Sequence, residues 1–452
     1  MNHKDIDRDT VPRGGHTADT IVALASGPGV AAIAVIRISG PATRSVLEAL
    51  TGALPEPRRA TLRRIGAPPI DRGLVLWFPA PASFTGEDMA EIQVHGGRAV
   101  VQAVVGAALA QSGTRLAEPG EFTRRAFENG RLDLTEVEGL ADLVQAETEA
   151  QARQALAQAE GALRRLYEDW RAELLNAQSL MEAGLDFSDE ADVALGASRK
   201  ASSTVEQLLR SLEMHLADRS GERLREGLRV VIAGPPNVGK SSLLNALAKR
   251  DAAIVSEEAG TTRDVIEVHL DLAGLPVILA DTAGIRDAAG ALETEGIRRA
   301  LARVEDADLV LWVIDATNPV FDPPRSFQGT RVVRTVNKAD LRPKVACEYQ
   351  TTPDVVLSAK TGQGLDDLVA GLEAAAKSQI GESLSAPLTR ARHRQELVQV
   401  RDALKRFVNH DLAPELSAEE LRIAAHHLGR LTGRIDVEEV LGAIFSAFCI
   451  GK

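Results

Sequence analysis

The first candidate for chemistry is a phosphate-binding loop near the middle of the chain, Gly234-Pro-Pro-Asn-Val-Gly-Lys-Ser241. Glycines at this spacing let backbone N–H groups wrap a polyphosphate, and a following helix adds the positive end of its dipole. Lys240 is placed to reach the β- and γ-phosphates, and the hydroxyl of Ser241 is placed to ligate Mg²⁺. The stretch therefore predicts a nucleoside triphosphate site, and a chance glycine turn is the alternative.

Two shorter motifs downstream have the residue types that hold Mg²⁺ and sense a γ-phosphate. Gly260-Thr-Thr-Arg-Asp264 places the hydroxyl of Thr262 where it can complete the Mg²⁺ shell. An apolar strand then delivers Asp281-Thr-Ala-Gly284, whose aspartate can hold Mg²⁺ through water and whose glycine N–H can contact the γ-phosphate. Their order and spacing after the phosphate loop predict a nucleotide hydrolase.

Two further motifs predict that the base is guanine. In Asn337-Lys-Ala-Asp340, which follows an apolar strand, the carboxylate of Asp340 can accept hydrogen bonds from N1–H and the 2-amino group of guanine. Adenine offers neither donor in that arrangement, and a buried acceptor left unpaired is costly. Ser358-Ala-Lys360 supplies a loop beneath the base. Together the motifs predict a GTPase domain over residues 223–379.

Hydrolysis in this domain is expected to depend on a group other than the glutamine that many GTPases use. Many GTPases place a glutamine directly after the aspartate motif to orient the attacking water, but this chain has Ile285 there. The side-chain oxygen of Asn237, together with oxygen ligands from the Ser256–Gly260 stretch, can hold a monovalent cation where other enzymes place an arginine. The alternative is that Asn237 only stabilises its own loop.

Composition narrows the class of protein. The 452 residues are 44% hydrophobic and 26% charged, which is typical of a globular protein of two to four domains. No apolar stretch approaches the length of a membrane span, and two cysteines cannot build a disulfide framework, so we expect a cytoplasmic protein. A net charge of −12 argues against nucleic-acid binding by the whole surface.

Helices and strands around these motifs predict three domains in which the GTPase domain is an insertion. Strands at 31–39, 73–78 and 90–95, with helices to about residues 50 and 111, predict a small α+β domain. Residues 121–234 contain no proline and are rich in helix formers, with a break near 186–190, and a second helical region closes the chain. Two helical segments flanking the nucleotide motifs indicate one helical domain with a GTPase domain inserted into it.

At several further motifs the chain resembles the MnmE (TrmE) family of bacterial tRNA modification GTPases, and the resemblance covers nearly its full length. The matching stretches outside the nucleotide motifs are Ile36–Pro41, Phe84–Asp88, Pro119–Phe122, Arg125–Phe127, Leu132–Leu134 and the terminal Phe448-Cys-Ile-Gly-Lys452. The last stretch is very specific to the family.

The resemblance implies an assembly and a reaction. It implies a homodimer whose N-terminal domain binds a 5-formyl- or 5,10-methylene-tetrahydrofolate, and whose GTPase domains pair in the presence of K⁺ and Mg²⁺. It further implies a heterotetramer or larger complex with the FAD-containing protein MnmG. That complex binds tRNA and installs a (carboxymethyl)aminomethyl group at carbon 5 of the wobble uridine, position 34.

The resemblance also implies roles for individual residues of the nucleotide site. K⁺ would be held by Asn237, Ser256, Glu258 and Thr261. Glu293 would orient the attacking water through a bridging water, although from sequence alone it is one more solvated carboxylate. Lys240 and Gly284 complete the predicted catalytic set. The predicted GTP-binding residues are Asn237, Val238, Gly239, Lys240, Ser241, Ser242, Ser256, Thr261, Thr262, Asp281, Thr282, Ala283, Gly284, Asn337, Lys338, Asp340, Ser358, Ala359 and Lys360.

A folate site in the N-terminal domain is implied in the same way. It would use Arg37, Glu91, Arg131 and Lys452, because a carboxylate can pair with the amino–imino edge of a pterin and cations suit the glutamate tail. Taken singly, Arg37 in a strand is equally explained by a structural salt bridge. Cys449 is a possible nucleophile toward uracil, with a packed thiol as the alternative.

The predicted fold is an N-terminal α+β domain that resembles a folate-binding domain, an α-helical domain, and an inserted α/β P-loop GTPase domain of the Ras type. The predicted boundaries are a disordered leader at 1–18, the N-terminal domain at 19–130, helical segments at 131–222 and 380–452, and the GTPase domain at 223–379. A different class of function, a GTP-dependent switch in ribosome or RNA assembly without modification chemistry, needs the nucleotide motifs but not the N-terminal domain or the Cys449–Lys452 terminus.

Overall fold

The computed structural model separates the chain into two compact units, residues 1–141 with 429–452, and residues 142–428. It describes residues 19–186, 191–250, 253–254, 267–281, 307–324, 327, 329–341, 353–381, 386–409, 413–435, 438–446, 448 and 451. The predicted leader at 1–18 lies outside the described residues.

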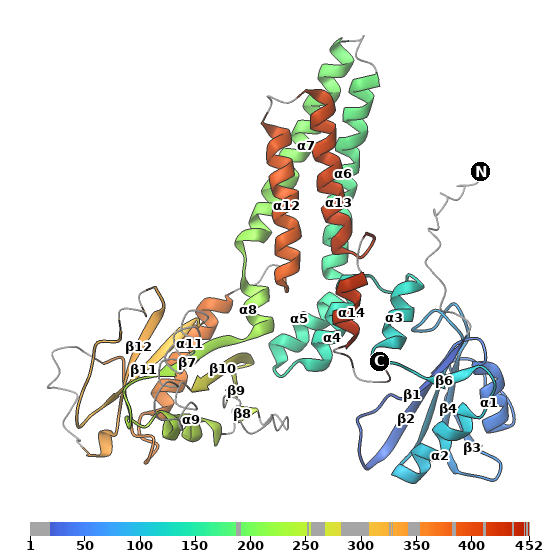
Figure 1. Ribbon diagram of the computed structural model, residues 1–452, viewed down its shortest axis with the longest axis horizontal. Coiled ribbons are helices and arrows are strands. Elements are labelled where there is room, and N and C mark those ends of the chain that lie inside the picture. Colours follow the sequence, from blue (N-terminus) through green and yellow to red (C-terminus); the bar gives the residue numbers. More distant parts are fainter. Residues whose placement is uncertain are drawn as a thin grey trace, which may run out of the picture. The chain divides into compact units, whose positions relative to one another are not determined.

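The first unit is built on a six-stranded mixed sheet (Figure 1). Its strand order is β3-β4-β5-β2-β1-β6, antiparallel except where β1 and β6 pair in parallel. The strands are β1 (Thr20–Leu24), β2 (Ala31–Ser39), β3 (Thr61–Ile65), β4 (Asp71–Phe78), β5 (Met89–Gly96) and β6 (Thr114–Leu116). The helices are α1 (Thr43–Thr51), α2 (Arg98–Leu109), α3 (Glu121–Glu128), α14 (Glu438–Ser446) and the first part of α4 (Leu134–Gln145).

Alternation along these strands decides which face of the sheet is covered. In β2 the side chains of Ala34, Ile36 and Ile38 are buried, and they share a core with Val46 and Leu47 of α1 and with Val104 of α2. The residues between them point to the opposite face, because successive side chains on a strand alternate. That opposite face carries Arg37 from β2 and Glu91 from β5, which lie side by side in register.

The second unit contains packed helices of seven to 27 residues (Figure 1). They are α5 (Glu149–Ala159), α6 (Ala162–Asp186), α7 (Ala191–Ala217), α8 (Ser220–Glu226), α12 (Ala391–Val408) and α13 (Pro414–Leu431). In α6 a stripe at three- and four-residue steps, from Leu163 through Tyr167 and Trp170 to Met181, is buried. This stripe is the one that the sequence predicts. Helix α6 ends at Asp186 and α7 begins at Ala191, and residues 187–190, where the sequence predicts a break, lie outside the described residues.

A seven-stranded sheet in the same unit carries the nucleotide motifs. Its order is β13-β12-β11-β7-β10-β9-β8, parallel from β13 to β10 and antiparallel at β9 and β8. The strands are β7 (Leu228–Ala233), β8 (Ala253–Ile254), β9 (Glu267–Leu272), β10 (Leu275–Asp281), β11 (Leu309–Asp315), β12 (Arg331–Asn337) and β13 (Val355–Val356). The helices are α9 (Lys240–Ala248), α11 (Leu365–Ile380) and the short 3₁₀ helix at Ala339–Leu341.

Parallel strands explain why motifs far apart in sequence can act together. The strands β7, β10, β11 and β12 run in the same direction, so their carboxyl ends meet at one edge of the sheet. Ligands bind at that edge in open α/β sheets. The predicted α+β, helical and α/β GTPase fold classes are confirmed. Among the described helices none is long and apolar enough to cross a membrane.

Candidate functional site

The phosphate loop connects β7 to α9, and its glycines are required by close backbone contacts. Gly234 has φ of +153°, and a Cβ there would lie 2.4 Å from the carbonyl oxygen of Val313. Gly239 has φ of +95°, and a Cβ there would lie 2.4 Å from the Asn337 side-chain nitrogen. A larger residue at either position would force the loop away from the neighbouring strands.

Lys240 extends over the phosphate loop. Its ammonium donates hydrogen bonds to the carbonyl oxygens of Gly234 and Pro235, each at 2.9 Å. Lys240, Ser241 and Ser242 form the first turn of α9, where backbone N–H groups lack helical partners and attract an anion. The loop therefore combines a cation, a helix N-terminus and a hydroxyl, the set that the sequence predicts for phosphate and Mg²⁺.

Asn337 joins the phosphate loop to the predicted base-recognition loops. Only 2% exposed, it donates from Nδ2 to the Val238 carbonyl at 2.9 Å and accepts at Oδ1 from the Ala359 N–H at 3.0 Å. The Ser358 hydroxyl donates to Asp340 Oδ1 at 2.7 Å. The structure thus brings residues 237–242, 337–340 and 358–360 close together.

One residue at this edge was missed by the sequence analysis. Asp315, the last residue of β11, accepts a hydrogen bond from the Lys338 ammonium at 2.6 Å, and the same ammonium donates to the Asn237 carbonyl at 2.7 Å. Burial alone would raise the pKa of the Asp315 carboxyl, but hydrogen bonds from Lys338 and Thr317 outweigh it and hold the pKa below its ordinary value. The only indication of Asp315 in the sequence is its position as an acidic residue at the end of an apolar strand.

Several predicted site residues lie outside the described part of the chain. They are Ser256, Glu258, Thr261, Thr262, Thr282, Ala283, Gly284 and Glu293. The backbone of Asp281 is described at the end of β10, where it pairs in register with Ile232 of β7. The roles of these residues toward Mg²⁺, K⁺ and the attacking water stay predictions.

The first unit contains a cavity of about 320 Å³ on the face of the sheet opposite α1 and α2. Arg37 and Glu91 line it as an ion pair at 2.8 Å, each with 21% of its side chain exposed. The Arg37 guanidinium lies 5.7 Å from the ring centroids of both Phe84 and Phe122. The cavity joins a charged pair to aromatic walls, a surface that suits a flat heterocycle with a polar edge.

Other predicted folate residues are placed differently. Arg131 is exposed, with its stem beside Gly86, and is not among the residues that line the cavity. Lys452 and Cys449 lie outside the described residues, although the neighbouring Gly451 accepts a hydrogen bond from Arg37 at 3.4 Å. Thr123, which no sequence pattern singles out, also lines the cavity. It is fully buried, and its hydroxyl has no hydrogen-bond partner within the described chain. A polar ligand atom in the cavity would satisfy that hydroxyl.

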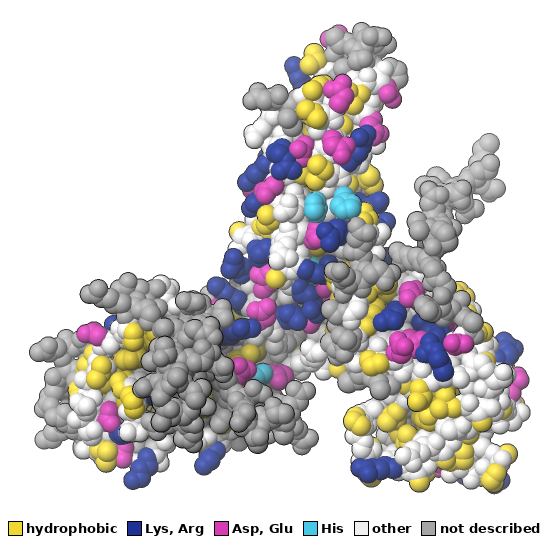
Figure 2. Space-filling view, viewed as in Figure 1, with side chains coloured by type: hydrophobic (Ala, Val, Ile, Leu, Met, Phe, Trp, Pro, Cys, Tyr) yellow, Lys and Arg dark blue, Asp and Glu magenta, His cyan; other side chains and the backbone are white. Residues whose placement is uncertain are grey.

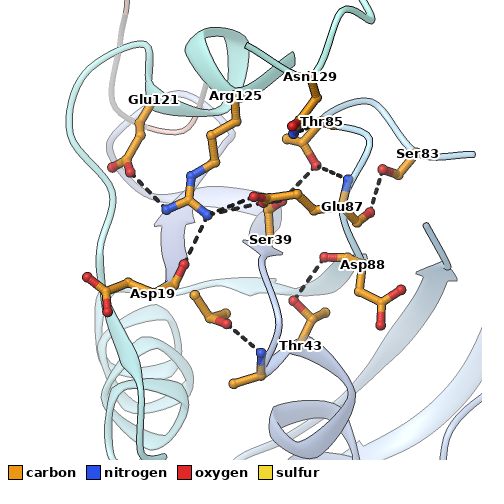
Figure 3. A network of polar contacts seen from close by, with 12 residues as sticks. Asp19, Ser39, Thr43, Ser83, Thr85, Glu87, Asp88, Glu121, Arg125 and Asn129 are labelled. Carbon is orange, nitrogen blue, oxygen red and sulfur yellow. Dashed lines mark hydrogen bonds and ion pairs between the residues drawn. The ribbon is translucent and has the colours of Figure 1, made fainter. Parts of the chain in front are cut away.

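A buried polar network supports one wall of this cavity (Figure 3). Arg125 of α3, 4% exposed, donates to the Asp19 carbonyl at 3.0 Å, to Glu87 at 3.1 Å and to Glu121 at 3.0 Å. The Ser39 hydroxyl also donates to Glu87, at 2.8 Å. These contacts fasten the loop of residues 83–88, which carries Phe84, to β2 and α3.

Glu121 of this network is kept ionised by its hydrogen-bond donors. Burial would raise the pKa of Glu121, but hydrogen bonds from Arg115, the Glu118 N–H and Arg125 hold the pKa below its ordinary value. Glu87, Glu121 and Arg125 all belong to the stretches on which the family resemblance rests. Their contacts show that these stretches build the wall of the cavity.

Comparison with known proteins agrees with this organisation. The family model of the GTP-binding protein TrmE N-terminus matches residues 20–131, and that of the MnmE helical domain matches residues 134–449. A tRNA modification GTPase MnmE of Rhodopseudomonas palustris (strain BisB18) is 52% identical over 446 residues, covering 96% of this chain and 99% of the relative. The protein of the same name from Rhodospirillum rubrum is 50% identical over 456 residues, covering 96% and 100%.

Among solved structures, a variant of Era from Aquifex aeolicus bound to GDP and AlF4⁻ is 25% identical, covering 41% of this chain and 69% of its own. Its TM-score of 0.26 is too low to place individual residues.

The fold and the site define a P-loop GTPase whose nucleotide domain lies within a helical domain in chain order. The two family matches and the near-complete coverage of the relatives then give the particular family. The chain belongs to the MnmE family of tRNA modification GTPases. It is a GTP hydrolase that acts in tRNA modification.

Proposed function

We propose that the protein is a K⁺-activated GTPase that works with the flavoprotein MnmG in the cytoplasm. Together they install a (carboxymethyl)aminomethyl group at carbon 5 of the wobble uridine, position 34, of certain tRNAs, and a tetrahydrofolate supplies the one-carbon unit. The observation that carries this proposal is that relatives at 52% identity span 96% of the chain, including both the nucleotide motifs and the N-terminal cavity. FAD enters only through MnmG.

The nucleotide residues divide into three proposed roles. The phosphate loop and Lys240 hold the phosphates, Asp340 with the 358–360 loop selects guanine, and Ser241 with Thr262 ligates Mg²⁺. The observed Ser358–Asp340 bond at 2.7 Å supports the second role, because it orients the carboxylate before the base arrives. Mg²⁺ would neutralise charge on the β- and γ-phosphates, and Glu293 would orient the attacking water through a bridging water.

K⁺ activation is proposed from the ligand set rather than from a bound ion. Asn237, Ser256, Thr261 and the backbone of Glu258 supply the oxygens, and only Asn237 lies in the described chain. The backbone of Asn237 has a φ of +63°, which is uncommon for a residue other than glycine. The Lys338 ammonium donates a hydrogen bond to the Asn237 carbonyl oxygen. An oxygen-rich site of this kind suits K⁺, whose charge would stabilise negative charge developing on the phosphates.

Replacing KCl with NaCl at constant ionic strength is expected to lower GTP turnover at least about tenfold, since a misfitted cation removes one charge-stabilising contact. The measurement is steady-state phosphate release at saturating GTP and Mg²⁺. GTP binding in NaCl, followed with a fluorescent analogue, is the control for a general salt effect. Equal turnover in the two salts would contradict K⁺ activation.

The cavity of the first unit is proposed as the tetrahydrofolate site. Glu91 would pair with the amino–imino edge of the pterin, Arg37 would fix that carboxylate, and Arg131 and Lys452 would attract the glutamate tail. The hydroxyl of buried Thr123, which has no hydrogen-bond partner among the described residues, fits a polar ring atom. When bound, the folate supplies the one-carbon unit, and the protein residues bind and orient it.

Glu91→Gln is expected to weaken 5-formyl-tetrahydrofolate binding about 30-fold, or about 2 kcal/mol, because an amide replaces the anionic acceptor of a charge-assisted bond. Isothermal titration calorimetry on the full chain measures the change. Glu56→Gln, at an exposed ion pair with Arg59 in the same unit, is the matched control and should leave affinity unchanged. Equal affinities for the two variants would remove Glu91 from the site.

A homodimer is proposed through the first unit. The sheet face opposite α1 and α2 exposes Ile33 of β2 at 60%, Leu62 of β3 at 51% and Leu74 of β4 at 38%. Leu62 and Leu74 lie opposite each other in the β3–β4 register, so they form one apolar strip. A second copy would cover such a strip, because contiguous exposed apolar side chains favour association.

tRNA is proposed to bind mainly to the complex with MnmG. Figure 2 shows Lys and Arg side chains intermingled with Asp and Glu along the long helices of the second unit. Pairs such as Lys405–Glu213 at 2.7 Å and Arg406–Glu420 at 2.8 Å neutralise many of these cations. With a net charge of −12, the isolated chain has little of the positive field that drives phosphate binding.

A GTP-dependent switch in RNA or ribosome assembly is the second candidate function. It would use the same nucleotide site and leave tRNA nucleosides unchanged. The cavity proposed as the tetrahydrofolate site favours the modification function, because a GTP-dependent switch does not require a one-carbon donor.

A further inference from the structure

Asp315 occupies a place in the nucleotide site that no motif of the sequence analysis explains. It ends β11, and only 15% of its side chain is exposed. Its Oδ1 accepts hydrogen bonds from the Thr317 N–H at 2.8 Å and the Thr317 hydroxyl at 2.7 Å. These two bonds fix the carboxylate so that Oδ2 faces the Lys338 ammonium at 2.6 Å.

Lys338 also contacts the phosphate loop. Its ammonium also donates to the backbone carbonyl of Asn237 at 2.7 Å. Both Lys338 and Asn237 have left-handed backbones, with φ of +65° and +63°. Residues other than glycine adopt that conformation infrequently, and asparagine adopts it more readily than lysine, so the Lys338 backbone is the more unusual of the two. The chain of contacts Asp315–Lys338–Asn237 therefore connects the end of β11 to the residue that offers an amide oxygen for K⁺.

We propose that Asp315 is a positioning residue for the monovalent cation that activates GTP hydrolysis. Its carboxylate neutralises the Lys338 ammonium beside Asn237, so that a second cation can bind next to that residue, and it holds Lys338 against the Asn237 carbonyl. The inference rests on the proposed K⁺ activation. It adds a residue that would touch neither the cation nor the nucleotide.

Electrostatics set the size of the expected effect. A unit charge about 8 Å from a bound cation changes the affinity for that cation roughly 2- to 30-fold, for an effective dielectric constant between about 80 and 20. The low pKa of Asp315 agrees with a carboxylate that is ionised at neutral pH. Removing its charge should therefore weaken K⁺ binding, while saturating K⁺ should restore turnover.

The test is a K⁺ titration of GTP turnover at constant ionic strength with the full-length Asp315→Asn variant. The half-saturating K⁺ concentration is expected to rise roughly fivefold, and kcat at saturating K⁺ to stay within about twofold of the unchanged protein. Asp315→Glu keeps the charge and should bring the half-saturating concentration back to within about twofold. Thr317→Ala, at an exposed position, removes the hydroxyl hydrogen bond to Oδ1 and keeps the one from the backbone N–H. It should raise the half-saturating K⁺ concentration by about twofold, and it carries the test if Asp315→Asn does not fold.

Glu373→Gln is the matched control, because Glu373 forms an acid–lysine pair with Lys377 on α11 of the same domain. It should leave the K⁺ titration unchanged. The inference is overturned if Asp315→Asn shows the K⁺ dependence of the unchanged protein, or if it loses GDP affinity in K⁺-free buffer with no shift in that dependence. A protein that hydrolyses GTP equally in KCl and NaCl before any substitution would overturn the proposed K⁺ activation itself.

Discussion

Asp340→Asn is expected to lower GTP affinity roughly 100- to 1,000-fold and to make the protein prefer xanthosine triphosphate. The Asp340 carboxylate is held by the Ser358 hydroxyl at 2.7 Å, so it meets the base in a fixed orientation. An asparagine offers a donor where guanine presents its own 2-amino donor, and the two repel. Xanthine carries an oxygen at that position and accepts the bond.

Competition binding against a fluorescent GDP analogue measures both effects. Asp322→Asn, an acid-to-amide change at an exposed position after β11, is the control and should bind GTP normally. Asp340→Asn with unchanged GTP affinity would show that Asp340 does not read the base. Lost GTP affinity without a gain for xanthosine triphosphate would point to a collapsed loop instead.

Arg125→Met is expected to destabilise the first unit by about 3–5 kcal/mol, because it leaves the carboxylates of Glu87 and Glu121 buried without their shared cation. Arg125 is 4% exposed and also holds the Asp19 carbonyl. Urea unfolding followed by tryptophan fluorescence measures the loss, since Trp77 lies in the core of this unit. Folate affinity should fall with it, because the loop that carries Phe84 loses its anchor.

Arg59→Met tests whether burial or the length of an ion pair determines its contribution to stability. Arg59 pairs with Glu56 at 2.8 Å, which is shorter than the 3.1 Å from Arg125 to Glu87, but the Arg59 pair is 72% and 71% exposed. Exposed ion pairs contribute only about 0–1 kcal/mol, so this variant should unfold almost as the unchanged protein does. Similar losses for Arg59→Met and Arg125→Met would contradict the role given to the buried network.

Most of the fold could be predicted because its signals are local. Alternation in residues 31–39, the stripe from Leu163 to Met181, and glycines at fixed spacing before Lys240 each depend on neighbours within a few residues. The nucleotide motifs could be ordered on strand ends for the same reason. The structure brings Asn337 to Val238 and Ala359, which the parallel strand order makes possible.

Side-chain environments were harder to predict, because charged residues are usually exposed and the sequence gives no measure of burial. Arg125 and Glu121 are four residues apart in the sequence, a spacing that gives no measure of burial, yet three segments converge on them (Figure 3). Asp315 belongs to no sequence motif, and its connection to the nucleotide site is visible only in its contact with Lys338, 23 residues away. Thr123 became a candidate only when its hydroxyl proved to be buried and unpaired among the described residues.

The central claim is that this GTPase drives modification of the wobble uridine, and tRNA nucleosides test it most directly. The gene would be deleted and total tRNA digested for nucleoside analysis by mass spectrometry. We predict loss of the aminomethyl-type groups at carbon 5 of the wobble uridine, restored by the unchanged protein but not by Asp340→Asn. Unchanged nucleosides in the deletion strain would contradict the claim and leave a GTP-dependent switch as the function.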